Sequence, residues 1–473
     1  MVKRPSNKII AIIIIFIVVG GSLGIIGIYF FLNNMDNGNS DGLNNIIIWT
    51  WVSGNKTTNI NGTYGIKGIP DSRNQPGSRT GAISWIDTND TLWLYGGWGY
   101  GESEQEGLLN DLWKFEDGIW TWVSGNKTTN LSGTYGIKGV PDKENHPGGR
   151  AYAVSWTDSY DNLWLFGGLS VNETGVEGGY NDLWKYNGVN WTWVSGNKTA
   201  RVYGVYGTKG VPDTANYPGS RGAAISWIDS DDNFWLFGGI GYSEPENIGY
   251  LNDLWKYNGV NWTWMSGNKT IEQFGEYGTK GVPDMANYPG SREDAISWTD
   301  SDDNLWLFGG WGYAEPLESD LLNDLWKFDG KNWTWVSGQK TANSISVYGT
   351  MGVPDAANYP GSRELSLSWI DSNDNLWLFG GQGCLESVGT THLNDLWKFD
   401  GINWTWISGT KTLESFGNYG TQDLPDITNY PGGRSHAISW TDSDDNHWLF
   451  GGWGFSESGS AGRLNDLWKF HLI

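Results

Sequence analysis

The chain has 473 residues, with 30 lysines and arginines against 53 aspartates and glutamates, which gives a formal net charge of −23. A surface this acidic repels phosphate, so the composition excludes nucleic acid as an expected partner. The lone cysteine, Cys384, excludes an intramolecular disulfide. The 33 tryptophans and 69 glycines favour many short strands joined by tight turns.

The N-terminal segment contains an uncharged, almost wholly apolar run over residues 9–32. A helix of this length, at about 1.5 Å per residue, spans the ~30 Å apolar core of a membrane. Lys3, Arg4 and Lys8 precede the run and the next basic residue is Lys56, which predicts a cytoplasmic N-terminus. A cleaved signal peptide is the alternative, although its apolar region is usually only ~7–15 residues. We therefore expect a cytoplasmic tail over 1–8, a transmembrane helix over 9–32 and a linker over 33–45.

An internal repeat of 71 residues fills the rest of the chain. A Gly-Gly pair, an arginine and the string Asn-Asp-Leu-Trp-Lys all recur at this interval. The string begins at Asn110, Asn181, Asn252, Asn323, Asn394 and Asn465. The periods occupy residues 46–473 without an insertion, so the sequence predicts one repetitive domain there.

Each repeat contains four short β-type runs, here named a, b, c and d, with tight-turn residues between a and b and between c and d. In the second repeat they are Ala151–Trp156, Leu163–Gly168, Asp182–Tyr186 and Trp191–Ser195. This pattern predicts an all-β fold, a six-bladed β-propeller with four-stranded antiparallel blades. The domain opens with a d-type run, Ile48–Ser53, and ends with a c-type run, Asp466–Phe470. We expect these two runs to pair and close the ring.

One group of residues carries a family resemblance. Gly167-Gly168 follows an apolar run, and Tyr186 and Trp193 come next with six residues between them. This resembles the Kelch motif, which the other repeats match with Phe or Tyr, and the resemblance covers residues 46–473. It implies the galactose oxidase/Kelch propeller superfamily, a relation of fold that does not transmit activity. The connection from d to the next a is longer than in typical Kelch blades.

Two sets of residues are candidates for a binding site. Because strand direction alternates, the b–c and d–a connections emerge on one face. The b–c connections carry aromatic residues that differ between repeats and can stack on sugars or grip peptide side chains. Packing beneath their own loops is the alternative. These residues are Trp98, Tyr100, Tyr242, Trp311, Tyr313, Trp453 and Phe455.

The second set is an arginine at the start of each run a, which we expect to ring the mouth of the central channel and which is suited to bidentate capture of carboxylates. Pairing with the aspartate of Asn-Asp-Leu-Trp-Lys, for instance Asp111, is the alternative. The arginines are Arg79, Arg150, Arg221, Arg292, Arg363 and Arg434. Residues beside them vary between repeats, as at Tyr152, Glu293, Asp294, Glu364 and His436.

No motif predicts catalysis. A galactose oxidase-like copper site needs two histidines, tyrosine ligands and a Tyr-Cys cross-link, but the histidines have no metal-ligand spacing. They are His146, His392, His436, His447 and His471. The turn Asp300-x-Asp302-x-Asn304 resembles the start of a calcium loop but lacks its glycine and its bidentate glutamate.

The sequence therefore predicts no enzyme, no catalytic residue, no metal site and no cofactor. It predicts a membrane-anchored extracellular module for binding or adhesion, which recognises a protein partner through the face of the b–c and d–a connections. A carbohydrate-binding propeller is the alternative, and a galactose oxidase-like metalloenzyme is the remote alternative.

Overall fold

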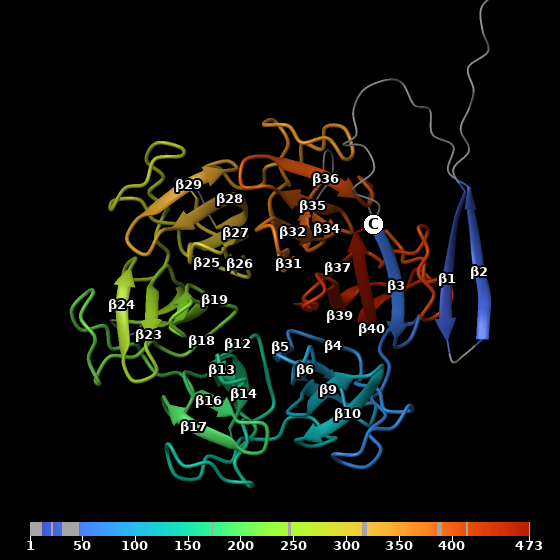
Figure 1. Ribbon diagram of the computed structural model, residues 1–473. Coiled ribbons are helices and arrows are strands. Elements are labelled where there is room, and N and C mark those ends of the chain that lie inside the picture. The colour runs from blue at the N-terminus through green and yellow to red at the C-terminus, as the bar shows by residue number, and fades with distance from the viewer. Residues whose placement is uncertain are drawn as a thin grey trace, which may run out of the picture. The chain divides into compact units, whose positions relative to one another are not determined.

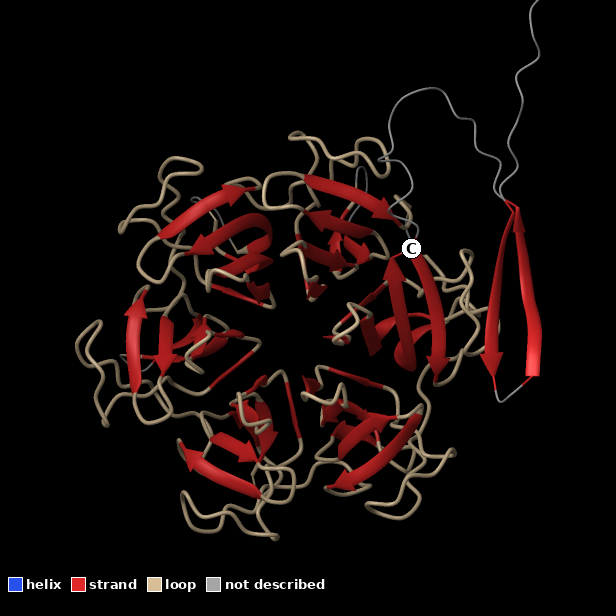
Figure 2. Ribbon diagram, viewed as in Figure 1, coloured by secondary structure: helices blue, strands red, loops and turns tan. Residues whose placement is uncertain are grey.

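The computed structural model describes residues 12–19, 22–30, 47–172, 174–244, 247–314, 319–385, 390–412 and 415–472. Contacts divide the chain into two compact units, Met1–Asn45 and Ile46–Ile473. Within the described ranges the regular secondary structure is entirely β-strand (Figure 2). The predicted all-β class is confirmed for this part of the chain.

The described part of the apolar N-terminal run forms strands, whereas the predicted tail over 1–8 and linker over 33–45 lie outside the described residues. β1 (Ile12–Val19) pairs antiparallel with β2 (Ser22–Phe30), from Ile12 opposite Phe30 to Val19 opposite Ser22. The predicted transmembrane helix over 9–32 is therefore wrong, and so is the predicted localisation as a single-pass membrane protein with an extracellular propeller. Among the described residues, no helix is long and apolar enough to cross a membrane. The run is rich in isoleucine and valine, whose branched side chains favour extended backbone, whereas the prediction weighed only apolar length.

The larger sheets of the second unit surround a central axis, as propeller blades do (Figures 1 and 2). The sheet of the second repeat is ordered, from the axis outward, β12 (Val154–Thr157), β13 (Leu163–Phe166), β16 (Leu183–Tyr186) and β17 (Trp191–Ser195). Runs b and c are predicted correctly except for slightly shorter bounds, and run d has the predicted bounds. Run a, predicted as Ala151–Trp156, is shifted to Val154–Thr157, since Ala151 belongs to the separate strand β11 (Arg150–Ala151). Every contact between neighbouring strands in this sheet is antiparallel.

The same order recurs around the axis. The corresponding strands are β5 (Ile83–Ile86), β6 (Leu92–Tyr95), β9 (Leu112–Glu116) and β10 (Ile119–Ser124); β19 (Ile225–Ile228), β20 (Phe234–Phe237), β23 (Leu254–Tyr257) and β24 (Trp262–Ser266); β26 (Ile296–Thr299), β27 (Leu305–Gly312), β28 (Asp320–Phe328) and β29 (Trp333–Ser337); β31 (Leu367–Ile370), β32 (Leu376–Phe379), β35 (Leu396–Phe399) and β36 (Trp404–Ser408); and β38 (Ile438–Thr441), β39 (His447–Phe455), β40 (Ala461–Leu472) and β3 (Ile47–Ser53).

The b–c connections, expected as loops, are hairpins that extend strands b and c beyond the Gly-Gly pair. Each pairs with a two-residue strand that carries one of the predicted arginines. The arginine strands are β4 (Arg79–Thr80), β11 (Arg150–Ala151), β18 (Arg221–Gly222), β25 (Arg292–Glu293), β30 (Arg363–Glu364) and β37 (Arg434–Ser435). In the fourth and sixth repeats the hairpin belongs to β27–β28 and β39–β40. Elsewhere it is formed by β7 (Trp98–Tyr100) and β8 (Glu106–Leu108), β14 (Leu169–Val171) and β15 (Glu177–Gly179), β21 (Ile240–Ser243) and β22 (Asn247–Tyr250), and β33 (Gln382–Cys384) and β34 (Thr390–His392).

The Gly-Gly pair makes this extension possible. Gly167 and Gly168 adopt φ angles of 67° and 88°, in the left-handed region that glycine enters without steric cost. A Cβ atom on Gly168 would lie 2.7 Å from the backbone oxygen of Ala151. The pair thus lets the chain turn from the large sheet into the hairpin while the arginine strand passes close beside it.

The two ends of the propeller unit pair as predicted. β3 lies antiparallel to β40, with Trp49 opposite Phe470 and Trp51 opposite Trp468. Trp49 and Trp51 are buried in the core of this sheet. The first strand of the unit therefore completes the last sheet, which joins the two ends of the ring without a disulfide.

This closure predicts the effect of removing β3. A chain that begins at Gly54 leaves β40 as an exposed edge and removes two buried tryptophans, so we expect aggregation and a lower melting temperature. Size-exclusion chromatography and thermal unfolding measure both effects, with a chain that begins at Ile46 as the matched control. Equal melting temperatures for the two truncated chains would show that β3 does not close the ring.

Candidate functional site

The predicted arginines lie in buried ion pairs, which was the alternative that the sequence left open. Each guanidinium contacts the aspartate of Asn-Asp-Leu-Trp-Lys at N–O distances of 2.6–3.0 Å, and every side chain in these pairs is at most 1% exposed. The pairs are Arg79–Asp111, Arg150–Asp182, Arg221–Asp253, Arg292–Asp324, Arg363–Asp395 and Arg434–Asp466. Guanidinium groups so placed face their aspartates inside the protein.

The residues two positions after each arginine form a ring around the channel axis. In the second repeat, the N–H of Tyr152 donates to the carbonyl oxygen of Gly81 in the first repeat at 2.9 Å. The same bond joins every neighbouring pair of repeats, at 2.9–3.2 Å, and forms a closed ring. The donors and acceptors are Tyr152 to Gly81, Ala223 to Tyr152, Asp294 to Ala223, Leu365 to Asp294, His436 to Leu365 and Gly81 to His436.

Backbone conformation in this ring is left-handed, with φ angles between 54° and 59°. Left-handed backbone costs a residue with a side chain roughly 1–2 kcal/mol, a cost that Gly81 in the first repeat does not have. The ring therefore needs only a glycine at each position. Tyr152, Asp294 and His436 occupy it at an energetic cost, a pattern typical of residues kept for the chemistry of their side chains.

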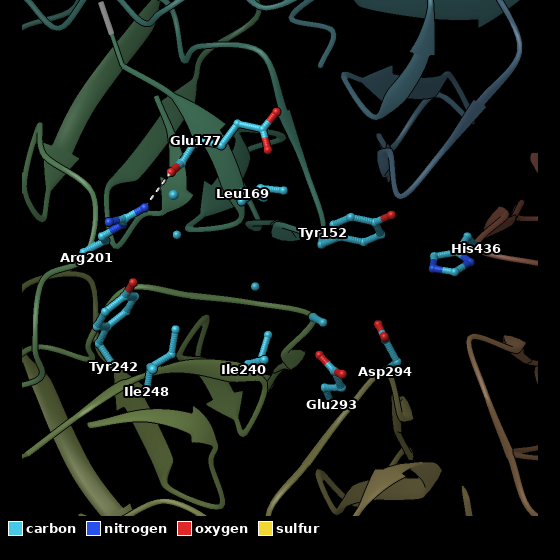
Figure 3. Close-up of a pocket in the computed structure, with 14 residues that line it drawn as sticks. Tyr152, Leu169, Glu177, Arg201, Ile240, Tyr242, Ile248, Glu293, Asp294 and His436 are labelled. Atoms are coloured by element: carbon cyan, nitrogen blue, oxygen red, sulfur yellow. Dashed lines mark hydrogen bonds between the residues drawn. The ribbon is translucent and has the colours of Figure 1, made fainter. Parts of the chain in front are cut away.

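A cavity of about 700 Å³, within the usual range for ligand sites, opens at this ring. We call it the channel-mouth cavity (Figure 3). Tyr152, Glu293, Asp294 and His436 line one end, and apolar and aromatic side chains line the other. Those at the other end include Leu169, Ile240, Tyr242 and Ile248, and the charged side chains of Glu177 and Arg201 lie at this end as well. The cavity thus joins an apolar wall to titratable groups at the axis.

Burial controls the protonation of the carboxyl groups at this end. It raises the pKa of Glu293 to about 7, and burial together with the charges of Glu293 and Asp320 raises the pKa of Glu364 to about 7. The pKa of Asp294 is raised well above its ordinary value by burial and then by the charges of Glu293 and Glu364. At neutral pH this shift favours the protonated form of Asp294, which can donate a hydrogen bond.

His436 is neutral at the same pH for a related reason. Burial, followed by the positive charges of His392 and Arg463, lowers its pKa to about 4. Its ring lies 5.6 Å from that of Tyr152. The raised pKa of Asp294 and the lowered pKa of His436 both favour the uncharged form of the side chain, so this end of the cavity offers hydrogen-bond donors and acceptors.

The predicted aromatic residues are half-buried, and among them only Tyr242 lines the channel-mouth cavity. Tyr242, Tyr313 and Phe455 each contact a second aromatic ring. The indole N–H of Trp98 and the hydroxyl of Tyr100 donate to Glu106. Trp453 lies 5.2 Å from the guanidinium of Arg463, and Trp311 pairs through its backbone with Glu293 and Leu321.

Sequence reasoning missed the outer wall of the cavity. Arg201 donates a hydrogen bond to the carbonyl oxygen of Glu177 at 3.3 Å, and Ile240 and Ile248 are exposed. A signal existed for Arg201, because the equivalent positions of the two preceding repeats carry Asn59 and Asn130. No sequence signal marked the isoleucines, since an apolar residue in a strand is usually part of the core.

The Asp-x-Asp-x-Asn turns on the opposite face are closed by their own hydrogen bonds. Asp300 accepts bonds from the side chains of Asn304 at 2.9 Å and Trp306 at 2.7 Å. Asp303 accepts one from the backbone N–H of Ser230 in the preceding repeat at 2.9 Å. Across the described part of the chain, no group of three or more His, Cys, Asp or Glu residues is placed to hold a metal ion.

The sequence matches no protein-family model and no curated protein. Among solved structures, YjhT is 15% identical with a TM-score of 0.48, over 84% of this chain and 98% of YjhT. The GH93 α-L-arabinofuranosidase of Fusarium graminearum, in complex with arabinobiose, is 10% identical with a TM-score of 0.43, over 87% and 98%. A fungal alcohol oxidase of the AA5 family, in complex with copper, is 13% identical with a TM-score of 0.39, over 82% and 62%.

Two of these similar chains are enzymes by name, an arabinofuranosidase and an alcohol oxidase. These names contradict the prediction that the present chain is not an enzyme. That prediction rested only on the absence of catalytic motifs from the sequence. What those proteins bind remains a property of those proteins. The present chain is an all-β propeller protein with a ligand-sized cavity at its channel mouth.

The ring of residues with left-handed backbone can be tested for strain at Ala223, whose side chain is a single methyl group. Ala223→Gly removes the steric cost and should raise the free energy of unfolding by about 0.5–1 kcal/mol, after the entropic cost of glycine. Ala224→Gly, at the next residue, is the matched control and should lower it by about 0.5–1 kcal/mol. Denaturant unfolding measures both, and equal effects would mean that the ring is unstrained.

The carboxyl cluster predicts a pH dependence of stability. A carboxyl group with a raised folded-state pKa stabilises the fold at low pH and loses that contribution as the pH rises through the folded value. For Glu293 the window runs from its ordinary pKa of 4.5 to about 7. Glu293→Gln should therefore raise the melting temperature at pH 8 by a few degrees relative to the native chain and change little at pH 4. Glu177→Gln, at the far end of the cavity, is the control; a shift that is the same at both pH values would contradict the burial of Glu293.

Proposed function

We propose that the chain is a six-bladed propeller of Kelch repeats that binds a carbohydrate in the channel-mouth cavity. The closed ring of hydrogen bonds through Gly81, Tyr152, Ala223, Asp294, Leu365 and His436 supports one blade for each repeat. The observation that carries the binding proposal is the composition of the cavity, in which aromatic and aliphatic side chains at one end face the hydrogen-bonding groups of Tyr152, Glu293, Asp294 and His436 at the other.

A sugar ring matches both halves of this cavity. Its C–H face packs on aromatic and aliphatic side chains, as Tyr242, Ile240 and Ile248 provide. Its hydroxyl groups donate and accept hydrogen bonds, and they therefore need partners of both kinds. The raised pKa of Asp294 favours a protonated group that donates, and His436 keeps one ring nitrogen for a ligand because its Nδ1 lies 3.2 Å from the hydroxyl of Ser435. Glu293, with a pKa of about 7, changes between donor and acceptor near neutral pH.

Hydrolysis of a glycosidic bond is the second candidate function. Glu293 and Glu364 come from neighbouring repeats, and each has a pKa of about 7. Glycoside hydrolases commonly use two carboxyl groups, one that protonates the leaving oxygen and one that activates water or attacks the sugar. If these residues act in this way, both Glu293→Gln and Glu364→Gln abolish hydrolysis of a bound oligosaccharide.

The binding proposal is tested with the full chain on an array of neutral glycans, followed by calorimetry with the glycan that binds best. We expect Tyr242→Ala and Glu293→Gln each to weaken binding by at least tenfold, since they remove opposite walls of the cavity. Phe455→Ala is the matched control, at the position equivalent to Tyr242 in the sixth repeat and outside the cavity. Its affinity should equal that of the native chain.

A protein partner that binds through the same face is the competing expectation. Binding of a neutral glycan depends little on salt, whereas a basic protein bound by the acidic surface is released as salt rises. Failure of every glycan to bind, or equal affinity in Tyr242→Ala, Glu293→Gln and the native chain, would overturn the carbohydrate proposal.

A further inference from the structure

A second site is indicated where the d–a connection meets the b–c hairpin near the rim of the face. Two equivalent positions, always 39 apart in the sequence, mark this place in each repeat. In three repeats both are aromatic, and their rings contact edge to face with centroids 5.5 Å, 5.5 Å and 5.6 Å apart. These pairs are Tyr203–Tyr242, Phe274–Tyr313 and Phe416–Phe455.

The second repeat has small side chains at the same two positions, Ser132 and Val171. A cavity of about 350 Å³ opens there, and both residues line it. We call it the rim cavity. Tyr135 and Tyr180 contribute aromatic surface, and Lys198 and Thr199 contribute an ammonium and a hydroxyl group. The space that an aromatic pair fills in three other repeats is thus a polar pocket with aromatic walls in this one.

The ammonium group of Lys198 is held in place at this pocket. It lies 4.9 Å from the ring of Trp193 and 5.8 Å from that of Tyr135, and it donates to the carbonyl oxygen of Gly136 at 3.4 Å. An ammonium group has three N–H donors, so this contact leaves capacity for a ligand. Cation–π contacts fix its position without neutralising its charge.

The equivalent lysines of other repeats are paired differently. Lys56, Lys127 and Lys269 form ion pairs with Glu457, Glu102 and Glu244 at 3.3 Å, 2.9 Å and 3.4 Å. Within the ranges that the structure describes, Lys198 has no carboxylate partner. Glu173, the residue that the repeat makes equivalent to these glutamates, lies outside those ranges.

We propose that the rim cavity is a second ligand site, which takes a small hydroxylated carboxylate such as a uronic acid. The carboxylate of the ligand pairs with Lys198, an interaction roughly twice as strong as a neutral hydrogen bond. Its ring packs against Tyr135 and Tyr180, and its hydroxyl groups reach Ser132 and Thr199. This site is separate from the channel-mouth cavity and does not depend on its function.

The test titrates the full chain with galacturonate and follows binding by calorimetry. Ser132→Phe with Val171→Phe copies the pair Phe416–Phe455 into the second repeat and should abolish binding, because two rings fill the pocket. This doubly substituted protein should fold, since the chain already uses the pair at the equivalent place; its melting temperature verifies this.

Lys198→Met keeps the aliphatic stem over Trp193 and should weaken galacturonate binding by at least tenfold. Lys269→Met, at the equivalent lysine of the third repeat, is the matched control and should leave it unchanged. Galacturonate binding should also persist in Glu293→Gln, which separates this site from the channel mouth. No binding to the native chain, or equal binding after Lys198→Met or after filling of the pocket, overturns the proposal.

Discussion

The buried ion pair between an arginine and an aspartate holds each repeat together. In the second repeat, the carboxylate of Asp182 accepts hydrogen bonds from Arg150, from the hydroxyl of Tyr135 at 2.8 Å and from the indole of Trp184 at 2.6 Å. Arg150 also donates to the carbonyl oxygen of Gly167 at 3.0 Å. One pair therefore connects the arginine strand, the Gly-Gly turn, strand c and the d–a connection. A charge pair in the interior is tolerated only when its hydrogen bonds are this complete, which explains why these residues recur at fixed spacing.

The same constraint decides where the repeats are free to differ. Residues that bond to the ion pair cannot be replaced without loss of a hydrogen bond. The residue two positions beyond each arginine needs only a left-handed backbone conformation, so its side chain can differ between repeats. Below it, the channel is lined by alanine in most repeats, at Ala82, Ala224, Ala295 and Ala437, and the hydroxyl of Ser155 bonds to the backbone of Ser84. Small side chains there bring the innermost strands together. Bulky or ionisable groups fit only at the mouth, and this is where Tyr152, Asp294 and His436 lie.

Both proposed sites arise where individual repeats depart from the others. At the channel mouth the departure adds ionisable groups, since Glu293, Asp294 and Glu364 carry carboxyl groups where the first repeat has Thr80 and Gly81. At the rim the departure removes volume, since Ser132 and Val171 replace a pair of aromatic rings. A repetitive scaffold can accommodate either change because the neighbouring repeats supply the rest of the packing.

The sequence by itself determined the period, the strands of each repeat, the pairing of β3 with β40 and the two possible partners of the arginines, because these depend on local pattern and on the phase of the repeat. It did not determine which partner the arginines take. It also misjudged residues 9–32, since an apolar run is compatible with a helix or with strands and its length alone does not decide between them. Only the tertiary structure brought Glu293 and His436, from different repeats, together with Tyr242 and Arg201 at one cavity. Their meeting depends on the curvature of the closed ring, which sets distances between repeats that no spacing along the chain encodes.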